Sequence, residues 1–334
     1  MSTSNRVALY DNAKFLLIIL VVIGHFIDPF TGGGGQSAAY QSIYLFIYSF
    51  HMPLFIFVSG QFHKNSNVLS KIFSFFCIGM SQKIVFSALD VIVNKNSPSF
   101  NLTGDWMPPW YMFALAAFIT ISYILRNIDK RFVLLMSIIL ALFVGYDSSV
   151  GDFLYLSRII VFYPFYLMGE LVERDKILKI CTNKILKIVA LVIIVAWGCL
   201  CIFKLDVLYT LRPLFTGRNP YSASVYAVSG IIYRMVCYLI STIVGLCVMI
   251  LVPNVKIPLL TRFGSRTMQV YFWHWPIGMI LLQTGISQYI CTSATTKIMW
   301  ILLAVLVGFV LSFKCFGFFT DKIIYYSREQ RENC

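Results

Sequence analysis

Long apolar runs separated by short polar connectors fill most of this sequence. Ten stretches are long enough, or nearly long enough, to cross a bilayer as helices. They run roughly over residues 12–30, 41–61, 72–93, 109–125, 132–146, 157–172, 188–203, 226–252, 268–284 and 297–319. The stretches 132–146 and 157–172 are the shortest. The pattern predicts an all-α, polytopic membrane protein with about ten transmembrane helices.

Composition supports the same class. Of the 334 residues, 59% are hydrophobic and 12% are charged, whereas a soluble domain carries roughly 25% charged residues. No connector is long enough for a soluble domain, so we expect a single membrane-embedded domain over residues 1–334. The nine cysteines form no CxxC pair, so neither a disulfide framework nor a metal site is expected.

The basic residues are dispersed over the connectors and produce a net charge of +13. Seventeen of the 27 lysines and arginines fall in connectors on one side of the predicted bundle and five on the other. This bias is typical of positive-inside topology rather than of nucleic-acid binding. It predicts a multi-pass protein of the cell (cytoplasmic) membrane with both termini in the cytoplasm.

The first apolar stretch carries two ionisable residues, Lys14 and His25. Eleven residues of α-helix make three turns plus about 20°, so the two share one helical face, roughly 16 Å apart along the axis. Ionisable groups inside a bilayer usually line a polar cavity and serve a function. The alternative is that Lys14 reaches the headgroups and His25 bonds a neighbouring helix.

Two further histidines lie within predicted spans. His51 stands about 15 Å from the outer end of the second stretch, followed by Pro53, which is expected to bend the helix. The short first loop makes the first two spans neighbours, so His25 and His51 are expected to face one cavity. His274 lies between Trp273 and Trp275, which form either an aromatic platform or an interfacial belt.

These residue types favour acyl transfer with an anionic donor. Histidine is suited to take a proton from a hydroxyl, and Lys14, Lys83, Arg158 and Arg234 supply cations within the spans for phosphates. Proton-coupled transport more often uses Asp or Glu at mid-depth, where this chain offers only Asp90.

Five motifs occur in an order that resembles the acyltransferase-3 family of multi-pass membrane O-acyltransferases. They are Asp11 with Lys14-x10-His25, FHMPLFIFVSG (50–60), Pro109-Trp110-Tyr111, YPFYLMG (163–169) and YFWHWP (271–276). The resemblance covers nearly the whole chain. The family usually has arginine where this chain has Lys14, which keeps the charge but removes bidentate geometry; fucose-acetylase-like members resemble this chain in accepting lysine there.

The resemblance implies transfer of an acetyl group from cytoplasmic acetyl-CoA to a hydroxyl of a cell-surface or lipid-linked glycan, such as capsule or O-antigen. His25 is then the catalytic histidine, acting as a base or as a transient acyl carrier, with Lys14 and His51 assisting. The expected donor-binding residues are Lys14, Arg126, Arg131, Arg262 and Arg266. The expected acceptor-binding residues are Trp110, Tyr111 and His274.

Other functions remain open at this stage. The acceptor could be peptidoglycan or a small metabolite, and the donor could be succinyl-CoA. From a different class, the chain could be a polysaccharide transporter or polymerase without acyl chemistry; paired half-helices, which many transporters show, are not seen.

Overall fold

The computed structural model describes residues 8–32, 36–95, 100–101, 103–104, 108–223 and 225–329. Within these ranges the secondary structure is helical, and no strand longer than the isolated bridge between Gly104 and Phe153 occurs. The chain is therefore an all-α, polytopic membrane protein, as the apolar pattern predicts.

Each of the ten predicted stretches contains a long helix, and the second contains two. These helices are α1 (Ala8–Ile27), α2 (Ala38–Tyr48), α3 (His51–Gln61), α4 (Val68–Asn94), α5 (Trp110–Ile124), α6 (Lys130–Phe143), α7 (Leu156–Leu171), α9 (Lys184–Phe203), α12 (Gly230–Leu251), α14 (Thr267–Leu281) and α16 (Ala294–Leu311). Shorter helices connect them: α8 (Arg174–Thr182), α10 (Leu205–Leu208), α11 (Arg212–Phe215), α13 (Pro258–Gly264), α15 (Ser287–Ile290) and α17 (Phe318–Glu329).

The helices differ in their reach across a membrane. Among the described residues, six segments are long and apolar enough to span: α1, α2 with α3, α4, α9, α12 and α16. Helices α5, α6, α7 and α14 have only 14 to 16 residues, or about 21–24 Å at helical rise. Since the hydrocarbon core is about 30 Å thick, each of these four helices is shorter than the core by itself, although α14 runs on through Leu282–Ile286 into α15.

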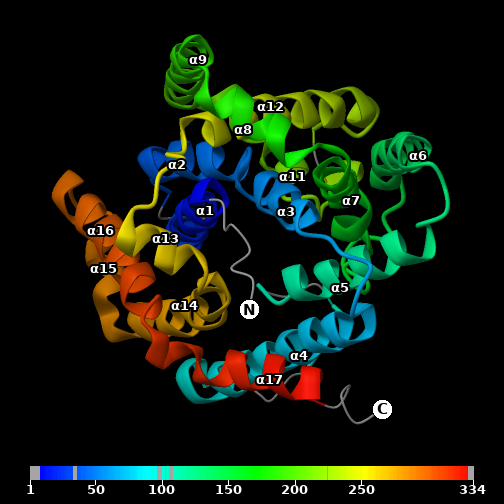
Figure 1. The fold of residues 1–334 in the computed structure, drawn as a ribbon. Coiled ribbons are helices and arrows are strands. Elements are labelled where there is room, and N and C mark those ends of the chain that lie inside the picture. The colour runs from blue at the N-terminus through cyan, green and yellow to red at the C-terminus, as the bar shows by residue number, and fades with distance from the viewer. Residues whose placement is uncertain are drawn as a thin grey trace.

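Helix α1 lies in the interior of the bundle (Figure 1). It contacts α2, α3, α13, α14 and α16, while α9 packs on α12 and α6 on α7. Its first turns are buried, including Asp11 and Asn12. By contrast, α9 and α16 expose most of their apolar side chains, as lipid-facing helices do.

The second predicted stretch is interrupted between α2 and α3, at Ser49 and Phe50. Pro53 lacks an N–H, so the carbonyl four residues earlier, that of Ser49, loses its helical partner. The Ser241 hydroxyl of α12 donates to that carbonyl at 2.5 Å, and the Trp197 indole donates to the Ser49 hydroxyl at 3.0 Å. The bend expected from Pro53 is therefore a full break, and His51 begins the new helix.

Two motif glycines set the crossing of α3 and α7. A Cβ at Gly60 would lie 2.1 Å from the Tyr166 carbonyl oxygen, and a Cβ at Gly169 would lie 2.2 Å from that of Phe57. Only glycine at both positions lets the two backbones approach so closely. Part of the second and fourth motifs thus serves helix packing.

The tenth stretch was predicted to run to residue 319, and this is wrong, because α16 ends at Leu311. The Gln269 side chain donates to the carbonyls of Leu311 and Phe313, the latter at 2.6 Å. These bonds satisfy acceptors that a continuing helix would have used. The chain then turns through Lys314–Gly317 into α17, which packs on α4 (Figure 1).

Candidate active site

One face of α1 lines two adjacent cavities. Lys14, Ile18 and Val21 line the first cavity, and His25 and Asp28 line the second. The spacing alternates between four and three residues, which places Lys14, Ile18, Val21 and His25 on one face of α1, and Asp28 follows in the turn directly after the helix. The face predicted from Lys14 and His25 is therefore the face that borders both cavities.

The larger space, here the histidine cavity, has a volume of about 450 Å³. Its wall includes His25, His51, Trp110, Trp275 and Arg158. A further set completes the lining: Asp28, Tyr44, Tyr48, Met52, Pro108, Phe162, Arg212, Pro213, Phe215, Thr216, Arg218 and Asn219. The volume lies within the range of small-molecule sites, about 300–1,000 Å³, so the cavity can hold a small ligand or one end of a larger one.

The smaller space, here the lysine pocket, has a volume of about 200 Å³. Lys14 lines it together with Ser59 and Tyr111, whose hydroxyls lie 2.9 Å apart. Met52 borders both spaces. Along α1 the boundary between the pocket and the cavity falls between Val21 and His25, in the C-terminal part of the helix.

Two neighbouring residues expected to bind the acceptor point into different spaces. Trp110 lines the histidine cavity, whereas Tyr111 lines the lysine pocket. Consecutive helical residues diverge by about 100° around the axis, and α5 begins at this point. Tyr111 is thus separated from the cavity that holds His25.

His25 has two aromatic neighbours on α14. Its ring centroid lies 5.2 Å from that of His274 and 5.1 Å from that of Trp275. His274 is fully buried and does not line the cavity. That His274 binds the acceptor stays a prediction; in the structure its ring packs against that of His25.

Hydrogen bonds show which ring nitrogen carries a proton in His51 and His274. His51 Nδ1 lies 2.9 Å from the Ile47 carbonyl oxygen and His274 Nδ1 lies 3.0 Å from that of Val270. A carbonyl only accepts, so each Nδ1 carries a proton, and when the ring is neutral the lone pair is on Nε2. Among the described residues, His25 Nδ1 has no hydrogen-bond partner.

Lys14 is partly buried at the edge of the lysine pocket. Its Nζ lies 3.7 Å from Asp11 Oδ1 and 4.2 Å from the centroid of the Phe62 ring. The carboxylate and the ring hold the ammonium on the pocket wall, where it retains 23% exposure.

The arginines expected at the donor site separate into two groups. Arg262 and Arg266 flank Gly264 and Ser265, which line the lysine pocket. Arg126 lies on the connector after α5 and Arg131 in the first turn of α6, and both are exposed; Arg126 lies over the Tyr123 ring at 4.2 Å. None of these four arginines is itself part of the described lining of the pocket, and the first pair lies next to lining residues in sequence.

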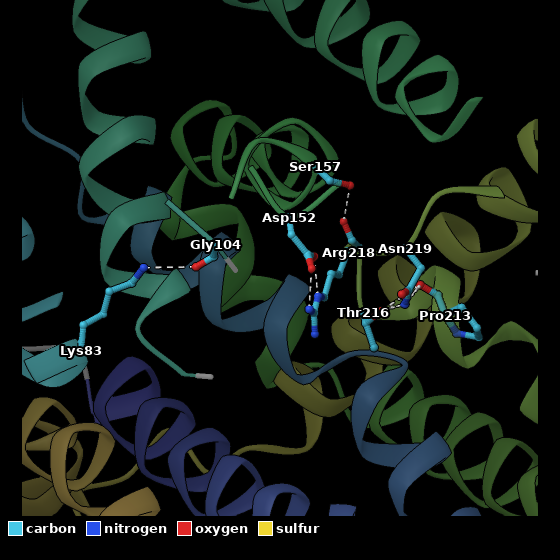
Figure 2. A network of polar contacts seen from close by, with 9 residues as sticks. Lys83, Gly104, Asp152, Ser157, Pro213, Thr216, Arg218 and Asn219 are labelled. Carbon is cyan, nitrogen blue, oxygen red and sulfur yellow. Dashed lines mark hydrogen bonds and ion pairs between the residues drawn. The ribbon is translucent and has the colours of Figure 1, made fainter. Parts of the chain in front are cut away.

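Three arginines of the histidine cavity were not predicted as site residues. From the sequence, Arg158 is one of the cations within the spans that could hold phosphates, and Arg212 and Arg218 are two of the five basic residues on the outer side. All three line the cavity. Arg212 and Arg218 were not predicted because the sequence does not show that segment 212–219 folds back onto the bundle. The Ser157 hydroxyl holds this segment by donating to the Gly217 carbonyl at 2.8 Å (Figure 2).

Two other cations within predicted spans have structural partners. Lys83 donates to the Asn101 carbonyl at 2.9 Å and to the Gly104 carbonyl at 3.1 Å, the latter bond drawn in Figure 2. Arg234 is fully buried and donates to the Tyr221 hydroxyl at 3.2 Å. Neither residue lines the cavity or the pocket.

A family model described as an acyltransferase domain matches residues 7–316. The chain belongs to the acyltransferase-3 family. It is also similar to the nodulation protein NolL of Mesorhizobium japonicum, with 38% identity over 72 residues, covering 22% of this chain and 19% of that protein. Similarity to NolL of Sinorhizobium fredii is 24% over 223 residues, covering 61% of this chain and 58% of that protein.

The alignments with both NolL proteins cover only part of those proteins. The chain spans about a fifth of one NolL protein and somewhat over half of the other. No solved structure matches the chain. Family membership therefore rests on the domain match, and the motifs that carried the resemblance lie inside the matched range.

Proposed function

We propose that this chain is a membrane O-acyltransferase that moves an acetyl group from acetyl-CoA to a hydroxyl of a cell-surface glycan. The observation that carries the proposal is the position of His25. In a member of an acyltransferase family, this imidazole stands on the wall of a 450 Å³ cavity, beside the boundary with a second pocket lined by Lys14.

The two spaces suit the two substrates. Acetyl-CoA enters from the cytoplasmic side through the lysine pocket, with its phosphates near Lys14, Arg262 and Arg266. Its pantetheine arm follows α1 over the roughly 16 Å of helical rise between Lys14 and His25. The acceptor sugar occupies the histidine cavity from the opposite side.

His25 then acts as a general base. A lone pair of the neutral imidazole takes the proton from the acceptor hydroxyl as the oxygen attacks the thioester carbonyl. Collapse of the tetrahedral intermediate expels the CoA thiolate, which recovers the proton from the imidazolium. The products are an O-acetyl ester and free CoA. His274 positions the His25 ring, and His51 offers Nε2 to the same cavity.

The direct test is the O-acetyl content of the envelope glycans in a deletion strain, measured by NMR before and after mild alkali. We expect one glycan to lose its O-acetyl groups and to regain them when the intact gene is restored. Unchanged O-acyl content in every envelope glycan, with no other acyl acceptor altered, would contradict the proposal.

A further inference from the structure

Tyr111 and Ser59 form a pair of hydroxyls on the wall of the lysine pocket. Their oxygens lie 2.9 Å apart, and both residues line that pocket, whereas neither lines the histidine cavity. The Tyr111 ring is buried and packs edge-on against the rings of Phe55 and Tyr271, with centroids 5.6 Å away in both cases. The hydroxyl pair therefore has a fixed position in the same pocket as Lys14.

The bonding pattern shows which way the protons of this pair point. The Ser59 hydroxyl donates to the Phe55 carbonyl at 3.0 Å. A hydroxyl has one proton and a carbonyl only accepts, so both bonds are made together only when the Tyr111 hydroxyl donates to the Ser59 oxygen. The phenol oxygen of Tyr111 then has no second proton to donate, and its lone pairs accept hydrogen bonds.

The rest of the pocket wall is mostly apolar. The apolar side chains of the described lining are those of Ile18, Val21, Met52, Phe55, Phe75, Met112, Leu115 and Met268. Two further hydroxyls of the lining already donate to the main chain. The Tyr271 hydroxyl donates to the Pro108 carbonyl. The Ser265 hydroxyl donates to the Arg262 carbonyl at 2.7 Å. Such a lining suits a largely apolar chain with isolated N–H donors and offers few partners for the many hydroxyls of a sugar ring.

We propose that Tyr111, oriented by Ser59, binds the pantetheine arm of the acyl donor by accepting a hydrogen bond from one of its amide N–H groups. The inference rests on the proposed function, which places acetyl-CoA in the lysine pocket. Pantetheine fits the lining because it joins apolar methylene and methyl groups through two amides, each with one N–H. The contact fixes the arm between Lys14, beside the phosphates, and His25, where the thioester reacts. Tyr111 is then a donor-binding residue rather than an acceptor-binding one.

The test is a binding cycle that changes the ligand and the protein in turn. Isothermal titration calorimetry on the full chain in detergent compares a non-reactive CoA thioether with two analogues, in each of which an ester oxygen replaces one pantetheine N–H. We expect wild-type protein to bind at least one ester analogue roughly 3- to 10-fold more weakly, the range that one neutral hydrogen bond supplies. In Tyr111→Phe the amide and ester ligands should bind within about twofold of each other, because the acceptor oxygen is gone.

A second tyrosine–serine pair supplies the matched control. The hydroxyls of Tyr163 and Ser122 lie 3.1 Å apart, both residues are buried, and neither lines the pocket or the cavity. Tyr163→Phe should keep the full preference for the amide ligand. Ser59→Ala should reduce this preference, because the Tyr111 hydroxyl is then released to donate to the ester oxygen, and this variant replaces Tyr111→Phe if the latter does not fold.

Equal affinity of wild-type protein for the amide ligand and both ester analogues would overturn the proposal without any variant. A preference that persists in folded Tyr111→Phe, or that Tyr163→Phe removes as well, would also overturn it. In each of these outcomes the CoA thioether still binds, so the proposed function stands. Failure of wild-type protein to bind the thioether would overturn both the proposed function and this inference.

Discussion

At the scale of single residues, a small neighbour and aromatic neighbours determine where His25 lies. A Cβ at Gly24 would lie 2.9 Å from the Tyr48 ring, so the glycine lets α2 approach α1 beside the histidine. Tyr48 in turn contacts the His51 ring, with centroids 4.7 Å apart. These contacts bring His25 and His51 to one cavity, as their depths in the sequence predict.

His274 provides a prediction at this scale. Removal of its ring in His274→Ala leaves a gap beside His25, and a misplacement of about 1 Å can cost up to about 10²-fold in rate. We expect kcat for acetyl transfer to fall roughly 10- to 100-fold while the acceptor KM stays within about twofold. Steady-state kinetics of the purified protein measure both. A raised acceptor KM at unchanged kcat would instead assign His274 to acceptor binding.

At the scale of elements, α1 spans the boundary between the pocket and the cavity, and it carries Lys14 and His25 at two depths. The periodicity of α1 made this face predictable. The packing of α13 on α1, which brings Gly264 and Ser265 to the lysine pocket, was not predictable, because it depends on tertiary contacts. A glycine makes this contact possible: a Cβ at Gly264 would lie 1.8 Å from the Asp11 carbonyl oxygen.

The donor assignment is tested on this element. Lys14→Gln and the double change Arg262→Gln with Arg266→Gln each remove positive charge at the lysine pocket. We expect each change to weaken the affinity for a non-reactive CoA thioether several-fold, as measured by isothermal titration calorimetry. The triple variant that combines them should lose more affinity than either. Because Lys14 keeps 23% exposure, solvent screening keeps the single effect modest. Equal CoA affinity in all three variants and wild-type protein would refute the assignment.

At the scale of the whole molecule, the sequence predicted the helical class, a helix in each apolar stretch and the face of α1. It did not predict that α16 stops at Leu311, because the Gln269 amide that satisfies the freed carbonyls comes from another helix. It also did not predict that Arg158, Arg212 and Arg218 line the histidine cavity. From the sequence alone, Arg212 and Arg218 are only basic residues that indicate topology. Their contacts with Asp28 and Asp152 hold the segment 212–219 at the cavity, and the sequence does not show these contacts.

The central claim is that His25 performs base catalysis between two substrates, and His25→Ala tests it most directly. The measurement is the O-acetyl content of the target glycan in the deletion strain carrying either wild-type or His25→Ala protein at matched membrane levels. His63→Gln, which changes a histidine bonded to Tyr166 and outside both spaces, serves as the control.

Loss of a general base typically lowers the rate by 10²–10⁴-fold, whereas loss of a structural hydrogen bond within a membrane costs about 0.6 kcal/mol on average. The account therefore predicts normal membrane insertion and no detectable O-acetylation for His25→Ala, with His63→Gln near the wild-type level. Acetylation by a normally inserted His25→Ala protein at more than about a tenth of the wild-type rate, well inside the expected loss, would contradict it.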